Sequence, residues 1–267
     1  MKKVKNHFLS IVIPAYRQEK TIARDLRRIR NVLEKIRYDY EIVVVTDGKE
    51  DRTFDNAQKV ASQKIKVVGY EKNHGKGYAI RYGMARTKGD VVAFIDAGMD
   101  LDPNGLSMLL EHFEWYDADI IVGSKRHSVS QVDYPWQRKI LSFGYQLLVR
   151  LLFGLNIRDT QVGMKFFKRK VLEDVLPRLL VKQYAFDIEI LAVARRLGFK
   201  RIFEAPIRLQ WDQGRSIISK SLWKILLNML KDTLAVFYRL KILRYYDEGN
   251  KRKWRYDPDL NFKVNIG

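Results

Sequence analysis

Three aspartates within seven residues are the sharpest chemical signal in the sequence. Asp96, Asp100 and Asp102 follow directly on the apolar run at residues 91–95. Carboxylates gathered this closely repel one another unless a cation holds them, and hard oxygen ligands suit Mg²⁺ or Mn²⁺. Asp102 has an alternative task, because it precedes Pro103 and can cap a helix that begins there. We therefore predict that Asp96 and Asp100 are metal ligands.

Two further stretches place side chains suited to nucleotide binding after apolar runs. Residues 14–19 read Pro-Ala-Tyr-Arg-Gln-Glu. Tyr16 can pack against a base, although a proline that merely closes a strand explains the pattern equally well. Asp47 ends the next apolar run and can accept hydrogen bonds from a base or ribose, whereas Asp51 is better explained as a helix cap.

A glycine-rich turn at residues 73–77 could hold a phosphate, with Lys76 as its cation. Glycine lets backbone N–H groups approach an anion, and the N-terminus of a following helix favours negative charge. The segment lacks the glycine spacing and the Ser or Thr of a P-loop, so a plain turn remains a competing interpretation.

These stretches need a sheet that brings them to one edge. Short runs rich in Val and Ile alternate with longer amphipathic segments, which predicts an α/β fold with a mainly parallel sheet and helices on both faces. In such sheets ligands bind beyond the carboxyl ends of the strands. The expected strands are residues 8–13, 41–45, 65–68, 91–95, 120–122 and 200–206, and the expected helices are 21–36, 77–86, 138–153, 187–197 and 220–246.

Taken in order, these stretches resemble the family-two nucleotide-sugar glycosyltransferases with the GT-A (Rossmann-like) fold. Within that family they are most similar to the polyprenyl-phosphate (dolichyl-phosphate-type) mannosyl- and glucosyltransferases. Residues 158–165, Arg-Asp-Thr-Gln-Val-Gly-Met-Lys, and residues 186–191, Phe-Asp-Ile-Glu-Ile-Leu, add to the resemblance. It implies a catalytic domain at residues 1–215, with a nucleotide half to about residue 125 and an acceptor half from about residue 126. An amphipathic basic helix and a polar tail would follow at 216–267.

The resemblance also implies a role for each matching residue. The residues that would line the nucleotide-sugar pocket are Pro14, Tyr16, Gln18, Val45, Asp47, Lys76, Asp96, Ala97 and Lys125. Asp96 begins the metal motif, but Gly98 stands where the family has a second acid, so Asp100 would supply the missing oxygen. Gln18 replaces a glutamate of the family pattern. Lys165 and Arg215 would position the acceptor phosphate and, with the two metal ligands, complete the catalytic set.

The composition narrows the classes of molecule that the protein is expected to bind. A formal net charge of +19 attracts polyanions, whether phosphates or anionic lipid. Nucleic acid is not expected, because no recognition helix, zinc finger or RNA-binding aromatic signature is present. The absence of cysteine excludes disulfides and thiolate metal sites. No apolar stretch is long enough for a transmembrane helix, and the N-terminus lacks the pattern of a secretory signal.

The C-terminal region favours a membrane surface. From Arg215 to the end, twelve Lys and Arg stand against five Asp and Glu, and apolar residues recur at helical spacing. A helix of this kind suits a bilayer interface, while packing on the catalytic domain is the alternative. The segment 140–155 could form a second interfacial element. We expect a peripheral protein on the cytoplasmic face of a membrane.

The resemblance implies an inverting transfer of a hexose from a UDP- or GDP-linked sugar to a polyprenyl phosphate, assisted by Mg²⁺ or Mn²⁺. If the acceptor were a sugar hydroxyl, a base would be required, and Asp159, Asp187 and Glu189 are its candidates. A non-catalytic nucleotide-binding protein at a membrane surface is the other alternative, because Gly98 interrupts the metal motif.

Overall fold

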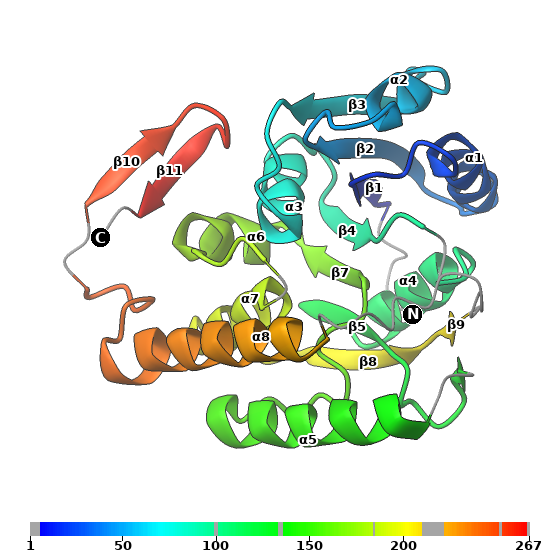
Figure 1. Ribbon diagram of the computed structural model, residues 1–267. Coiled ribbons are helices and arrows are strands. Elements are labelled where there is room, and N and C mark those ends of the chain that lie inside the picture. Colours follow the sequence, from blue (N-terminus) through cyan, green and yellow to red (C-terminus); the bar gives the residue numbers. More distant parts are fainter. Residues whose placement is uncertain are drawn as a thin grey trace.

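A seven-stranded sheet forms the centre of the computed structural model, which describes residues 6–98, 101–132, 136–183, 185–209, 222–250 and 253–265. Its order is β3-β2-β1-β4-β7-β5-β8 (Figure 1). The strands are β1 (Phe8–Ala15), β2 (Asp39–Asp47), β3 (Ile65–Tyr70), β4 (Val91–Ile95), β5 (Ile120–Ser124), β7 (Met164–Lys168) and β8 (Ile202–Pro206). All neighbours pair in parallel except β7, which runs antiparallel to β4 and β5. The predicted mainly parallel α/β fold is confirmed.

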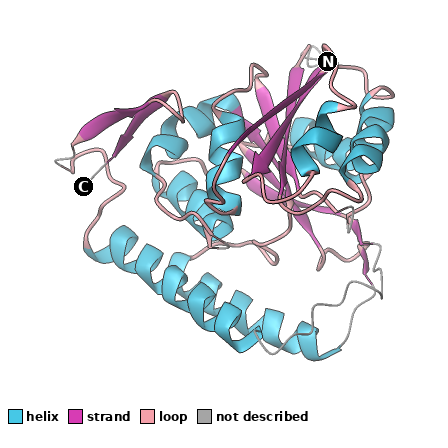
Figure 2. Ribbon diagram, turned by 45° about the horizontal axis from the view of Figure 1, so that its top comes forward, coloured by secondary structure: helices cyan, strands magenta, loops and turns pink. Residues whose placement is uncertain are grey.

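Helices cover both faces of the sheet (Figures 1 and 2). One face packs against α1 (Ile22–Leu33), α2 (Thr53–Gln58) and α4 (Gly105–Trp115), and the other against α3 (Lys76–Met84), α6 (Arg169–Val175) and α7 (Phe186–Arg196). The alternation of β4 shows why both layers are needed. Val92 and Phe94 enter the core on the α3 side, whereas Ala93 and Ile95 enter the core on the α1 side. A strand buried on both faces is apolar throughout, as its sequence is.

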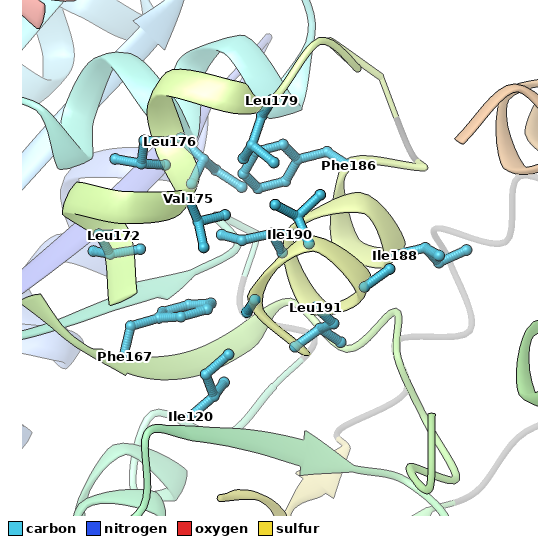
Figure 3. Close-up of a cluster of buried hydrophobic side chains, with 14 of the residues drawn as sticks. Ile120, Phe167, Leu172, Val175, Leu176, Leu179, Phe186, Ile188, Ile190 and Leu191 are labelled. Carbon is cyan, nitrogen blue, oxygen red and sulfur yellow. The ribbon is translucent and has the colours of Figure 1, made fainter. Parts of the chain in front are cut away.

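The core beneath α6 and α7 is built from aliphatic and aromatic side chains that meet between the helices and the sheet. Figure 3 shows Phe167 and Ile120 from the sheet facing Leu172, Ile190 and Leu191 from the helices. All five are less than 4% exposed. Each side chain of this size contributes roughly 1.5–3 kcal/mol when buried. The two helices are thereby fixed to the sheet, and α7 carries two buried acids into the interior.

Two long helices lie side by side below the sheet, α5 (Trp136–Phe153) and α8 (Leu222–Phe237) (Figure 1). The Tyr145 and Thr233 hydroxyls are 2.6 Å apart, and the rings of Phe153 and Phe237 meet edge to face. A π-helical turn, Tyr238–Ile242, continues α8. Among the described helices none is both long enough and apolar enough to cross a bilayer.

The polar tail expected from the sequence contains regular structure. It forms an antiparallel hairpin of β10 (Trp254–Asp257) and β11 (Phe262–Asn265). The Asp257 carboxylate accepts the backbone N–H groups of the turn, and Leu260 is buried at its tip. Two short strands, β6 (Gln131–Val132) and β9 (Arg208–Leu209), pair beside the main sheet, and a 3₁₀ turn spans Leu176–Arg178.

Candidate active site

Asp96 lies at the carboxyl end of β4, at the centre of the sheet. Its backbone N–H donates to the Gly163 carbonyl at 2.9 Å, which ties the end of β4 to the residue before β7. A Cβ atom on residue 163 would lie 1.9 Å from Oδ2 of Asp96. Only glycine therefore allows the carboxylate to occupy this place. Sequence reasoning singled out the segment but missed this role of Gly163.

A chain of alternating charges runs from Asp96 into the interior. Nζ of Lys76 is 2.8 Å from Oδ2 of Asp96 and 3.6 Å from Oδ2 of Asp187. The other oxygen of Asp187 accepts from Nζ of Lys165 at 2.6 Å. Lys76 is the first residue of α3 and Asp187 the second of α7, so two helices and two strands meet in this chain. The arrangement places the Lys76 ammonium beside Asp96, the predicted metal ligand.

The pKa values in this chain follow from the ion pairs. Burial alone would raise the pKa of Asp187, but the ammonium groups of Lys165 and Lys76 outweigh it and hold the pKa below its ordinary value. Burial alone would lower the pKa of Lys76, but the carboxylates of Asp187 and Asp96 raise it above the ordinary value. Lys76 therefore stays a cation at neutral pH, as a partner of phosphate must.

Lys165 has a different environment from the one that an acceptor-binding residue needs. Its side chain is fully buried, and Nζ donates to the Val162 carbonyl at 2.7 Å as well as to Asp187. No phosphate can contact an ammonium enclosed in this way. The structure instead has Lys165 hold Asp187, and through it Lys76, in position. Arg215, the other residue predicted to bind the acceptor phosphate, lies outside the described residues.

The metal prediction can be tested on Asp96 itself. Its Oδ1 atom is buried and has no hydrogen-bond partner among the described residues, which leaves one hard oxygen available to a divalent cation. Asp100, the second predicted ligand, lies outside the described residues. The described part of the chain contains no cluster of three or more acidic, His or Cys side chains around a cation site. Asp96 is therefore suited to bind a metal ion, but it supplies only part of the coordination sphere.

Gly98 explains why the second acid of the motif is absent. Its φ angle is +105°, a conformation that side chains other than glycine rarely adopt. A Cβ atom here would meet only the Gln18 side chain, at 3.7 Å, so space is not the constraint. The backbone conformation, rather than crowding, disfavours aspartate at this position.

Asp47 organises the glycine-rich turn. Its carboxylate accepts the Tyr70 hydroxyl at 2.9 Å, the Asn73 amide at 3.1 Å and the backbone N–H groups of His74 and Gly75 at 2.8 and 3.0 Å. It is 3% exposed. These four donors occupy both oxygens, so Asp47 fixes the turn that leads into Lys76. Asn73 was singled out from the sequence only as the first residue of the glycine-rich turn, and Tyr70 was not singled out.

The other residues predicted to line the nucleotide pocket surround the ends of β1 and β2. Pro14 and Val45 are register partners, but Val45 is fully buried in the core, where β2 pairs with β1 and β3 on its two sides. Tyr16 is 40% exposed and donates its hydroxyl to Glu50 at 2.9 Å. The Gln18 side-chain oxygen accepts the Thr21 hydroxyl at 2.9 Å.

A cavity of about 170 Å³ opens beside Asp96. Ala97 and Lys125 line it, together with Gln161 and Gly163. The Lys125 ammonium lies 3.5 Å from the Asp159 carboxylate, which also accepts the Lys125 backbone N–H at 3.2 Å. The structure thus brings Asp96, Ala97 and Lys125 together around one cavity, with the Lys76 ammonium 2.8 Å from the Asp96 carboxylate.

Comparison with known proteins gives this arrangement a context. Residues 10–176 match the sequence model described as "Glycosyl transferase family 2". The chain is 33% identical to the dolichyl-phosphate beta-glucosyltransferase of Homo sapiens, over 88% of this chain and 76% of that protein. It is 31% identical to the protein of the same description from Saccharomyces cerevisiae, over 77% of this chain and 67% of that protein.

Solved structures agree on the fold. Glucosyl-3-phosphoglycerate synthase from Mycobacterium tuberculosis, in complex with Mn²⁺, UDP and phosphoglyceric acid, superposes with a TM-score of 0.65. The superposition covers 97% of this chain and 86% of that chain at 20% sequence identity. The same synthase in complex with UDP gives a TM-score of 0.64. The predicted GT-A fold is confirmed.

Proposed function

The chain belongs to glycosyl transferase family 2, and we propose that it transfers a hexose from a nucleotide diphosphate sugar to a polyprenyl phosphate. The relatives named for dolichyl-phosphate glucosylation support this acceptor and point to glucose as the sugar. The solved neighbour that binds UDP supports a uridine nucleotide rather than a guanosine one. The observation that carries the proposal is the available Oδ1 of Asp96 beside the Lys76 ammonium.

The donor diphosphate would lie in the cavity beside Asp96. Asp96, with Asp100 as the expected second ligand, would hold Mg²⁺ or Mn²⁺, and a neighbour of this fold binds Mn²⁺ together with UDP. Such a cation stabilises the negative charge on a departing diphosphate. Lys125 adds positive charge at the lining of this cavity, and Lys76 adds it beside the Asp96 carboxylate. They would orient the diphosphate and neutralise its charge as it leaves.

The transfer itself needs few groups. An acceptor oxygen forms a bond to the anomeric carbon as the bond from that carbon to the diphosphate oxygen breaks. The bonding electron pair leaves with the diphosphate, and attack from the opposite face inverts the carbon. A phosphate oxygen is already anionic, so it needs no general base.

The three carboxylates named from the sequence as possible bases for a hydroxyl acceptor are all engaged. Asp187 pairs with Lys165 and Lys76. Glu189 is fully buried and accepts the Tyr246 hydroxyl at 2.7 Å. Asp159 is 6% exposed and accepts the Lys125 backbone N–H. This occupancy favours a phosphate acceptor over a sugar hydroxyl.

The exposed side of α5 and α8 would bring the enzyme to its lipid acceptor. Large apolar side chains at helical spacing are exposed on both helices and on the π-helical turn after α8: Phe143, Leu147 and Leu151 on α5, Leu227 and Leu234 on α8, and Tyr238 on the turn. Basic residues such as Lys231 and Lys241 are exposed near them. Paired apolar and basic faces of this kind bind anionic membrane surfaces. Because the cytoplasmic leaflet is the anionic one, we place the protein there.

A donor and acceptor screen tests the proposal. Purified protein is incubated with Mn²⁺ and radiolabelled UDP-glucose or GDP-mannose, with polyprenyl phosphate or a free sugar as the acceptor. We expect label in the polyprenyl phosphate fraction from UDP-glucose. Transfer only to the free sugar would reject the lipid acceptor. Nucleotide binding that is indifferent to metal, with no transfer to either acceptor, would favour a non-catalytic protein.

A further inference from the structure

A second and larger cavity lies below the sheet, between α5, β8 and the loops at residues 124–130 and 154–163. Its volume is about 470 Å³, within the usual range of ligand sites. His127 and Ser128 line it from one loop, Arg158 from the other, and Gln146 and Arg150 from α5. It shares no lining residue with the cavity beside Asp96. The two cavities flank the same two loops, but they are separate spaces.

The lining of this second cavity is basic. Arg150 and Arg158 are exposed, and neither guanidinium has an ion pair or hydrogen bond among the described residues. The acid in the lining, Glu204, is already engaged, because its Oε1 accepts the backbone N–H groups of Arg158 and Asp159 at 2.8 and 3.0 Å. With two guanidinium groups against one carboxylate, the lining carries a net positive charge, which favours an anion with several oxygens.

A third group points to the same kind of ligand. The Nδ1 atom of His127 is buried and has no partner among the described residues. Buried polar atoms usually have a hydrogen-bond partner in the protein or in ordered water, and a ligand is another group that could supply one here. Gln146 stays in place because its side-chain oxygen accepts from the guanidinium of Arg126 and its amide donates to the Ile157 carbonyl at 3.4 Å. These two hydrogen bonds hold Gln146 in the cavity wall.

The cavity adjoins an apolar surface. Phe143, Leu147 and Leu151 are spaced four residues apart on α5 and are 63%, 49% and 75% exposed. Arg150 lies next to this stripe, since positions 143, 147 and 150 share one face of a helix. A ligand with a phosphate head and apolar chains could place its head in the cavity and its chains along the stripe.

We propose that this cavity binds a phosphomonoester group, with Arg150 and Arg158 as its charge partners and His127 as a further contact. The continuous apolar stripe identifies the headgroup of a membrane phospholipid as the source, and free phosphate shares the same chemistry. The site would hold the enzyme on phosphate-rich membrane, separately from the donor and acceptor that react near Asp96. It does not depend on the transfer reaction.

Vesicle binding and calorimetry test the proposal. Cosedimentation is measured with phosphatidylcholine vesicles that contain phosphatidic acid or, at matched surface charge, phosphatidylserine. The pocket variants are Arg150→Gln, Arg158→Gln and the double variant. Lys231→Gln is the matched control, because it removes an exposed charge from α8 without touching the cavity. Inorganic phosphate is titrated into each protein by isothermal calorimetry.

We expect each pocket substitution to weaken binding to phosphatidic acid vesicles about tenfold, since each removes a charge-assisted contact. Lys231→Gln should weaken binding to both kinds of vesicle equally and less strongly. Phosphate binding that disappears in the pocket variants, with unchanged vesicle binding, would keep the site but identify soluble phosphate as its source. Pocket variants that match Lys231→Gln on vesicles and retain the phosphate response of the wild type would overturn the proposal.

Discussion

Gly163→Ala should displace the central carboxylate of the site without unfolding the protein. The added Cβ atom would lie 1.9 Å from Oδ2, 2.2 Å from Cγ and 2.8 Å from Oδ1 of Asp96. Ordinary contact begins at 3.4 Å, so carboxylate and methyl group must separate by about 1.5 Å (3.4 minus 1.9). The backbone around residue 163 has little freedom, because its carbonyl accepts the Asp96 N–H and β7 starts at the next residue. The side chain of Asp96 must therefore move.

A movement of this size has a calculable consequence. It breaks the 2.8 Å contact between Asp96 and Lys76 and removes Oδ1 from its position. Misplacing a reacting group by about 1 Å can cost a factor of about 100 in rate. Local overpacking costs about 1–3 kcal/mol of folding stability. We therefore expect kcat/KM for sugar transfer to fall about 100-fold, while circular dichroism shows a folded protein with a moderately lower Tm.

The matched control makes the same chemical change where space is open. Gly144 lies in α5, and a Cβ atom there would meet nothing within 4 Å. Gly144→Ala should leave the rate of transfer unchanged and raise stability by about 0.5–1 kcal/mol, as alanine does within a helix. Wild-type transfer rates in Gly163→Ala, measured with the same donor and metal, would refute the placement of Asp96 against Gly163.

Three further predictions concern the buried charges. Lys165→Met leaves the Asp187 carboxylate buried with Lys76 as its remaining partner. Urea denaturation should therefore show that the free energy of unfolding falls by about 3–5 kcal/mol. A decrease below about 1 kcal/mol would be inconsistent with this ion pair. Tyr246→Phe removes the hydroxyl that donates to Glu189 at 2.7 Å. The free energy of unfolding should fall by about 1–3 kcal/mol in the same assay, and limited proteolysis should cleave the C-terminal segment more readily. Unchanged protease resistance would argue that this hydrogen bond does not hold the segment in place. Because the folded-state pKa of Asp187 lies below its ordinary value of 3.8, the stability it contributes is complete above that value and is lost as the pH falls through the folded pKa. Thermal melts across this acid range should show a shallower decline for Asp187→Asn than for the wild type, and parallel curves would contradict the assigned charge.

The sheet could be predicted because its strands are buried on both faces. β1, β2 and β4 are runs of Val, Ile and other apolar residues, and such runs leave little choice of structure. β7 was missed because it contains Lys165, a charge that suits a central strand only when Asp187 lies beside it. That partner is 22 residues away in the sequence. Local patterns cannot reveal a contact made by tertiary folding.

The position of the site could be predicted from the sequence, but the contacts between its residues could not. Asp96 and Lys76 follow strands, so the sheet edge that they share was evident from the sequence. The tasks of Asp47 and Lys165 were not, because each depends on hydrogen bonds to distant segments. The close approach of Gly163 to Asp96 is likewise a tertiary contact. The sequence shows that residue 163 is glycine, but it does not show which neighbouring atom leaves no room for a side chain there.

The most direct test of the account is the transfer of labelled glucose from UDP-glucose to polyprenyl phosphate by wild-type protein and by Asp96→Asn. The account predicts transfer by the wild type with Mg²⁺ or Mn²⁺, its loss on chelation, and no transfer by Asp96→Asn, a nearly isosteric change that removes the charge of the carboxylate. Transfer that survives both chelation and Asp96→Asn would contradict the assignment of Asp96 as the centre of the site.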